Sequence, residues 1–149
     1  LRNLALIQLE LEQRLEGADL RDLNFSGYVL SSADQPKQLI RVNLDGSNLE
    51  GTDLTLASLR GSRLRAAKLN RCILDQADLR DTDLSGAELQ DISCRDTRFL
   101  GADFTGAILR ASDVKRIMLA LHAEQVAFPD TVADSWIRIT QRVLNKSVV

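Results

Sequence analysis

The chain of 149 residues is poor in the residues that most often carry chemistry or covalent cross-links. It has one histidine, two cysteines and one tryptophan, and aromatic residues make up only 4% of it. A lone histidine without a cysteine cluster cannot build a zinc site, and two cysteines without paired spacing do not make a disulfide framework. We therefore expect no metal and no cofactor, and two free thiols in a reducing, cytoplasmic compartment.

An excess of charge of one sign is missing as well, and so are long apolar runs. The 19 lysines and arginines are set against 21 acids, which leaves a net charge of -2. Chains built to bind phosphate backbones or anionic lipid carry a marked basic excess, so we expect no direct nucleic-acid binding. No apolar run is long enough to cross a bilayer, and the charged start lacks the small-residue cleavage site of a secretion signal. We expect no membrane insertion. The first residue is leucine, so we also expect a processed chain or a segment of a longer protein.

What the sequence does contain is an apolar residue at every fifth position, which we call a centre. Upstream centres at Leu20, Phe25 and Leu30 keep the same step, residues 31–37 interrupt it, and Leu39 resumes it. The uninterrupted run of centres is Leu44, Leu49, Leu54, Leu59, Leu64, Leu69, Leu74, Leu79, Leu84, Leu89, Cys94, Phe99, Phe104, Leu109 and Val114.

Neither regular element buries such a pattern. A five-residue step moves about 140° around an α-helix, and it changes face at every step along a straight strand. A short extended piece with one corner per five residues does place every centre on the inside. The residue two before each centre is mostly small, as at Thr52, Ala57 and Cys72, which suits a narrow interior. Glycine recurs two residues after a centre, as at Gly46 and Gly86, where a corner needs backbone freedom.

The run "VNLDG SNLEG TDLTL ASLRG SRLRA AKLNR CILDQ ADLRD" resembles the pentapeptide-repeat family, whose signature is A(D/N)LXX, and the resemblance is to cyanobacterial members in particular. It covers roughly residues 15–116. The resemblance implies an all-β solenoid, a right-handed quadrilateral β-helix with four pentapeptides per coil and nearly five coils. Larger residues two before the centre, at Leu23, Tyr28, Lys37 and Val42, predict an irregular first coil.

The two ends of a solenoid expose apolar interior and unpaired backbone, so we expect caps. Residues 1–14 place Leu4, Ile7 and Leu11 at helical spacing and predict an N-terminal capping helix, although alternation over residues 9–12 would also suit a strand. Residues 117–149 are expected to form a helical cap or a dimerisation segment. Its first helix would begin with Ser112 or Asp113 as N-cap.

Residues 31–37 predict a turn-rich loop that projects from a corner, either as a tolerated insertion or as a contact surface.

Cys72 and Cys94 both point inward on adjacent coils, offset by two residues, which leaves them too far apart for an unstrained disulfide.

Charges twenty residues apart should stack on one face of the solenoid. The basic stretch 60–71 then lies against the acidic stretch 75–91, and the complementary pairs outnumber the like-charge pairs Arg60–Arg80, Asp83–Asp103 and Arg95–Lys115. Each exposed pair contributes only about 0–1 kcal/mol, so we expect such pairs to set the register. The complementary pairs are Arg63–Asp83, Lys68–Glu88, Arg71–Asp91, Asp45–Arg65, Asp75–Arg95, Asp78–Arg98 and Asp96–Arg116.

The chemistry-bearing patterns point away from catalysis. The glycines follow the corner spacing, no G-x-S-x-G motif is present, and Asp81 and Asp83 would lie on a convex wall without a pocket. His122 is expected to be a packed or surface residue. We expect no enzyme and no catalytic residue.

The leading hypothesis is a non-enzymatic scaffold that binds another protein. Candidate partner contacts are Val29, Leu56 and Ile73 on one face, and Trp136 on a second C-terminal helix that could form a homodimer. The alternative comes from the resemblance: some pentapeptide-repeat proteins bind DNA gyrase as mimics of duplex DNA. Such a mimic needs long acidic stripes, whereas acids and bases alternate between coils here.

Overall fold

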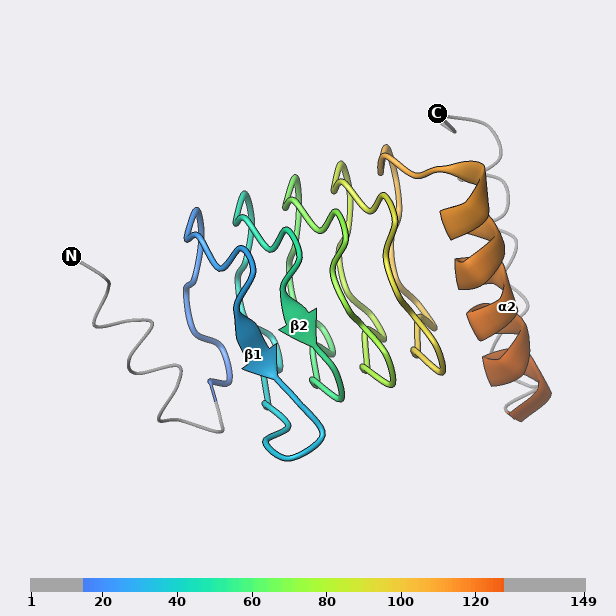
Figure 1. Cartoon of the computed structure of the whole chain (residues 1–149), viewed down its shortest axis with the longest axis horizontal. Helices are drawn as coiled ribbons and strands as arrows, with labels where there is room; N and C mark the ends of the chain where they lie inside the picture. The colour runs from blue at the N-terminus through green and yellow to red at the C-terminus, as the bar shows by residue number, and fades with distance from the viewer. Residues whose placement is uncertain (1–14, 128–149) are drawn as a thin grey trace.

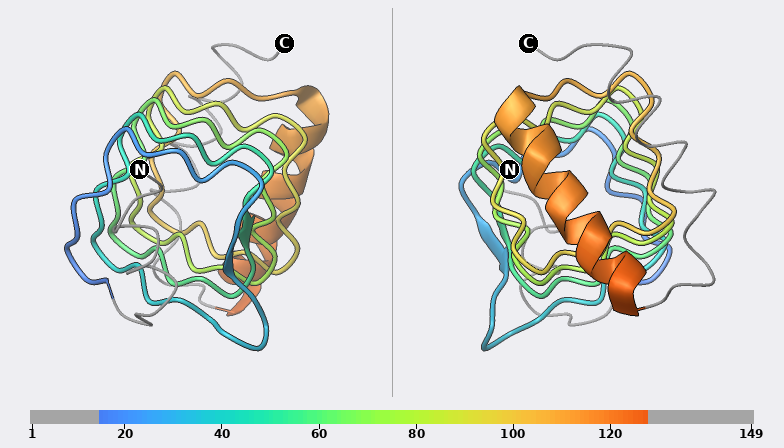
Figure 2. Two further views of the ribbon diagram at one scale, coloured as in Figure 1. Left: turned by 60° about the vertical axis from the view of Figure 1, so that its left-hand side comes forward. Right: turned by 90° about the vertical axis from the view of Figure 1, so that its right-hand side faces the viewer.

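The computed structural model describes residues 15–127 as a stack of four-sided turns of chain, closed at the C-terminal end by one long helix (Figure 1). The elements in chain order are the strands β1 (Val29–Ser31) and β2 (Asp53–Leu54) and the helix α2 (Ala111–Ala127). β1 and β2 pair in parallel, and further parallel bridges continue the pairing around the stack. Figure 2 shows successive turns lying over one another around a common axis.

The backbone pairing has the twenty-residue step that the sequence predicts. Asn43 pairs with Arg63, Arg63 with Asp83, and Asp83 with Asp103. In the first turn the step is longer, because Asp19 pairs with Asn43. The insertion before Leu39 lengthens that turn, and the pairing of β1 with β2 contains a register shift. The expected irregularity of the first coil is therefore present.

The centres form the core, with the leucines of the middle turns almost completely buried (Leu49 to Leu89, 0% exposed). The small residues two before them also point inward, and their hydroxyls bond to main-chain carbonyls as expected. The Thr52 hydroxyl donates to the Phe25 carbonyl at 2.8 Å, and the Ser62 hydroxyl donates to the Leu39 carbonyl at 2.7 Å. A buried hydroxyl with an acceptor avoids the free-energy cost of an unpaired polar group.

Each corner is a tight turn in which the residue two after the centre has a positive φ. The N–H of Ser47 closes one such turn on the carbonyl of Leu44 at 3.1 Å, with φ of 67° at Gly46. This conformation favours glycine, yet nine corners within residues 15–127 carry another residue, among them Leu56 and Ala66. The solenoid therefore tolerates backbone strain at these corners because the stacked turns hold them.

Exchanging glycine and alanine at two stacked corners should give opposite effects. Ala66 has φ of 54° and Gly86 has φ of 67°, one turn further along. We expect Ala66→Gly to raise the free energy of unfolding and Gly86→Ala to lower it, each by about 1 kcal/mol. A Cβ on Gly86 would meet nothing closer than the Ala66 nitrogen at 3.9 Å, so steric overlap does not contribute. Urea unfolding measures the free energy of unfolding of both variants. A lower value for Ala66→Gly than for the wild type would show that Ala66 is not strained.

The insertion is shorter than the sequence suggests, since its two ends are buried. Ser31 belongs to β1, and its hydroxyl donates to the Thr55 carbonyl at 2.7 Å and accepts the N–H of Lys37 at 3.0 Å. Lys37 is only 5% exposed and occupies the inward position of its turn. The part that projects is residues 32–36, which leave the stack after β1 (Figure 1).

The solenoid ends before the expected boundary at residue 116, because α2 begins at Ala111, one residue before the earlier of the two predicted N-caps, Ser112 and Asp113. Val114 was expected as the last inward centre, and it is instead a partly buried residue of the helix. The N-cap expectation is wrong in the same way: Arg110 precedes the helix, and the Asp113 carboxylate reaches back to accept its N–H at 3.1 Å. This is the arrangement of an acid in the first turn of a capped helix.

α2 crosses the open end of the last turn (Figure 2, right). Its buried face carries Ile117, Ala120 and Leu121, which cover the interior of the coil. The expected helix over residues 1–14 and the second C-terminal helix with Trp136 lie outside the described residues. Within residues 15–127 the structure has no helix that is long and apolar enough to span a membrane.

Candidate interaction surfaces

Two of the predicted contact residues lie on one wall of the solenoid. The main-chain pairing runs from Val29 to Asp53, then to Ile73 and Ser93, so these four side chains form one outward row. Val29 is 67% exposed and Ile73 37% exposed, with the carboxylate of Asp53 between them. Leu56 lies at the corner that follows this wall, with φ of 59°, and is half-buried. Trp136 lies outside the described residues.

The ion pairs follow the twenty-residue step only in part. Asp45 pairs with Arg65 at 2.8 Å and Asp75 with Arg95 at 3.2 Å, as predicted. Arg63 instead reaches Asp45 at 2.5 Å, and Arg71 reaches Glu50. The main-chain hydrogen bonds set the spacing of the turns. An arginine side chain is long enough, however, to pair with an acid that does not lie directly above or below it.

The like-charge stack of Arg60 and Arg80 is relieved because each arginine contacts an acid nearby. Arg80 lies one turn after Arg60, and each finds its own acid: Arg60 contacts Asp81 at 3.6 Å and Arg80 contacts Asp78 at 2.5 Å. Arg116 contacts Asp113 at 3.2 Å, instead of the predicted Asp96. Acids and bases are thus interleaved over the walls.

The acids directly before the centres have a structural role that sequence reasoning did not assign. The Asp83 carboxylate accepts the backbone N–H of Ser85 at 3.0 Å and its hydroxyl at 2.6 Å, across the Leu84 centre. The Asn43 and Asn48 side chains accept the N–H of Asp45 and Glu50 in the same manner. A side-chain oxygen that bonds two residues ahead stabilises the turn that follows, which explains the Asp or Asn of the repeat.

No cluster of potential metal ligands occurs among residues 15–127. Asp81 sits at a corner with its carboxylate 3.6 Å from Arg60, and the Asp83 carboxylate accepts the Ser85 N–H, so each of the two acids has a structural contact. His122 is an exposed residue of α2.

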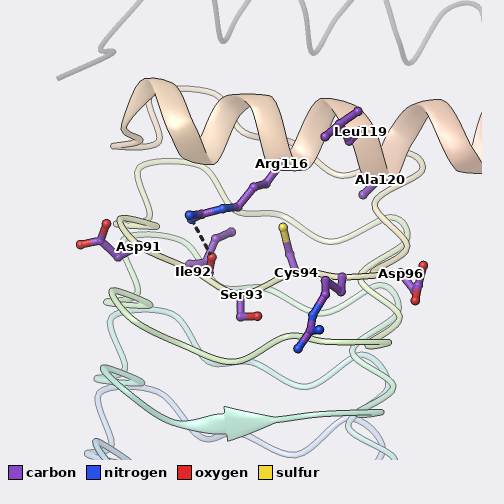
Figure 3. A pocket seen from close by; sticks show the side chains of 9 residues that line it. Asp91, Ile92, Ser93, Cys94, Asp96, Arg116, Leu119 and Ala120 are labelled. Carbon is purple, nitrogen blue, oxygen red and sulfur yellow. Dashed lines mark hydrogen bonds between the residues drawn. The ribbon is translucent and has the colours of Figure 1, made fainter.

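The structure contains a feature that the sequence did not reveal, a cleft of about 710 Å³ between α2 and the last turn of the solenoid. One side is the segment 91–96, and the other is the face of α2 that carries Arg116, Leu119 and Ala120 (Figure 3). Arg116 extends across the cleft and donates to the carbonyl of Ile92 at 3.2 Å. Leu119 is 63% exposed, although it lies on a covering helix.

Both cysteines are buried free thiols, as expected, and Cys94 lines the cleft. Burial raises the pKa of both thiols from the ordinary value of 9.0, most strongly for Cys72. For Cys94 burial outweighs the nearby charge of Arg116, and the pKa rises to about 11. Because the thiolate is the reactive form, the raised pKa keeps both thiols in the protonated, less reactive form near neutral pH.

These thiols should make folding stability fall at alkaline pH. Below pH 9 the Cys94 thiol is protonated in both states, whereas above it only the unfolded chain loses the proton until the folded pKa of about 11 is reached. We expect the free energy of unfolding to fall by at most about 1.4 kcal/mol per pH unit for Cys94 in this range. Urea unfolding of the wild type and of Cys94→Ala between pH 8 and 11 measures this loss of stability. If the free energy of unfolding falls equally with pH in both proteins, Cys94 does not contribute.

The stacked parallel turns with inward centres place the protein in the class of β-solenoids. The family model for pentapeptide repeats matches residues 38–76 and 77–116, with eight copies, which is more than half of the chain. The chain belongs to the pentapeptide repeat family, whose members form right-handed β-helices. A search of the curated proteins finds no match.

Among solved structures, the chain is similar to the pentapeptide repeat protein Rfr23 from the cyanobacterium Cyanothece 51142. The identity is 20% and the TM-score 0.50, over 70% of this chain and 96% of that one. A second pentapeptide repeat protein, alr5209 from Nostoc Pcc 7120, shares 29% identity with a TM-score of 0.42, over 70% and 92% of the two chains. Trypsin-treated QnrB1, a plasmid-mediated fluoroquinolone resistance protein, shares 17% identity with a TM-score of 0.31, over 65% of each chain.

Proposed function

We propose that the protein is a non-enzymatic scaffold of nearly five four-sided coils that binds another protein through a solenoid wall. The observation that carries the proposal is the row of Val29, Asp53 and Ile73, in which two exposed branched side chains flank a carboxylate on a flat wall. Stacked turns joined by main-chain hydrogen bonds hold these side chains at constant spacing. A rigid surface loses little conformational entropy when a partner binds.

The distribution of charge supports a protein partner rather than imitation of DNA. The opposite wall carries Asn43, Arg63, Asp83 and Asp103, so its outward row mixes neutral, basic and acidic side chains. A duplex mimic would present acids at successive steps of such a row. The cytoplasmic location expected from the two reduced thiols fits a partner inside the cell.

A matched pair of substitutions tests the wall. Ile73 and Ile108 are both 37% exposed, but Ile108 lies on a different wall, in the row of Lys68 and Glu88. We expect Ile73→Arg to remove a partner captured from the source organism and identified by mass spectrometry, whereas Ile108→Arg retains it. Equal retention by both variants would overturn the choice of wall.

A supercoiling assay tests the class of function. The scaffold predicts no effect on DNA gyrase at micromolar protein. Inhibition of supercoiling, or protection of gyrase from a quinolone, would replace the scaffold by the gyrase-binding alternative.

A further inference from the structure

The cleft beside α2 exposes an unfinished main-chain ladder. In the preceding turn, the N–H groups of Leu74 and Gln76 donate to the carbonyls of Ser93 and Arg95, each at 2.7 Å. The equivalent groups one turn later are the N–H groups of Cys94 and Asp96. The chain that would have accepted them has already entered α2, which begins at Ala111.

Side chains of α2 make only some of the hydrogen bonds that a further turn would have made with residues 91–96. The Asp113 carboxylate accepts the N–H of Asp91 at 3.2 Å, and Arg116 donates to the carbonyl of Ile92. The N–H groups of Cys94 and Asp96 have no acceptor among residues 15–127. Cys94 lies on the extended piece and Asp96 at the corner that follows it, with φ of 54°. Both N–H groups face the side where a further turn would lie, because their equivalents at Leu74 and Gln76 both donate to the next turn.

The rest of the cleft indicates what could complete the ladder. Its volume of about 710 Å³ is in the range of sites that enclose a ligand, and the exposed side chain of Leu119 offers an apolar contact. Of the charged residues that line the cleft, Asp91 pairs with Arg110, Arg95 with Asp75 and Arg116 with Asp113. The exposed carboxylate of Asp96, by contrast, makes no ion pair within the described residues, so the charge left over at this site is negative.

We propose that this cleft binds an extended peptide segment of a partner protein, which adds a parallel strand to residues 92–96. Alternate carbonyls of an extended peptide point the same way and match the two free N–H groups. An apolar side chain of the peptide packs on Leu119, and a lysine or arginine pairs with Asp96. This inference rests on the proposed protein-binding role and gives it a second site, separate from the wall of Val29 and Ile73.

An array of octapeptides tests the site. The four central positions are varied among Leu, Lys, Glu and Gly, and labelled full-length protein is applied. We expect binding to peptides that combine Leu with Lys, and at least tenfold weaker binding when Lys is replaced by Glu. With Asp96→Lys the preference should reverse toward Glu; arginine already occupies the equivalent corner at Arg41 and Arg71, so this backbone accepts a long cation.

Two variants of equal exposure locate the binding. Leu119 is 63% and Val29 67% exposed, so neither change to arginine disturbs a core. We expect Leu119→Arg to weaken the best peptide at least tenfold in fluorescence anisotropy, and Val29→Arg to leave its Kd unchanged. Equal effects of the two variants would show that the peptide does not bind in the cleft, and so would peptides that bind no better than the all-Gly control. Neither result would affect the proposal that the wall of Ile73 binds a partner, which is tested separately.

Hydrogen exchange reports directly on the ladder. In the free protein the amides of Cys94 and Asp96 should exchange at least tenfold faster than those of Leu74 and Gln76. The bound peptide should slow Cys94 and Asp96 selectively by a similar factor. Protection of these two amides before any peptide is added, or no change on binding, would refute strand addition.

Discussion

Replacing Leu79 by arginine is expected to unfold the chain. Leu79 is a centre of the middle of the stack and is 0% exposed, with other leucine centres above and around it. The guanidinium would lose its hydration without gaining a partner, and such a buried charge costs more than about 4 kcal/mol. A typical domain has only about 5–15 kcal/mol of stability in total. Far-UV circular dichroism and urea unfolding measure the loss.

The position in a solenoid increases the damage. Each turn contacts only its neighbours, so a disrupted middle turn separates the two halves of the stack. Leu79→Ala should cost about 2–5 kcal/mol and leave a folded chain, because it removes contacts without adding a charge. Ser58→Arg serves as the matched control, since Ser58 is the outward residue of the same wall one turn earlier. Near-wild-type unfolding of Leu79→Arg would show that this residue does not point inward.

Replacing Asp113 by alanine is expected to have the second largest effect, a loss of about 2–3 kcal/mol. Asp113 is 0% exposed, and its carboxylate accepts the N–H of Arg110 at the start of α2 and the N–H of Asp91 in the last turn. Its other oxygen contacts Arg116 at 3.2 Å. Alanine leaves two backbone donors without their acceptor and removes one of the hydrogen bonds between the helix and the solenoid.

The loss should be local before it is global. We expect the amides of α2 to exchange faster in Asp113→Ala, whereas the amides of the middle turns, such as Leu64 and Leu69, keep wild-type protection. Asp113→Asn is the matched control, because it retains an acceptor oxygen and should lose about half as much stability. Equal exchange in α2 of Asp113→Ala and the wild type would show that packing alone holds the helix.

The five-residue pattern predicted the inward leucines and the buried hydroxyls, and its resemblance to the pentapeptide repeats supplied the solenoid with four pieces per coil. This works because the pattern is local: every turn of chain repeats the same short extended piece and corner. The Thr52 and Ser62 hydroxyls and the glycine corners follow from that repeat. Pairing at a step of twenty follows in turn, because four such pieces close one coil.

The sequence did not predict the partner of a charged side chain that can reach several neighbours. Asp45 meets both Arg65, one turn away, and Arg63, because a long flexible cation reaches several acids at nearly equal cost. The role of Asp83 in holding its own turn was hidden for the same reason: an aspartate looks the same in the sequence whether it faces solvent, a cation or the backbone.

The walls of this protein can be read from the repeat, because five residues are enough to specify one strand and one corner. The end of the stack depends instead on tertiary contacts. The chain leaves the five-residue step at Ala111, before the sequence pattern stops, because a helix with Asp113 in its first turn can bond to the last coil. That early departure leaves the N–H groups of Cys94 and Asp96 without an acceptor in the part of the chain that the structure describes, and it opens the cleft beside α2.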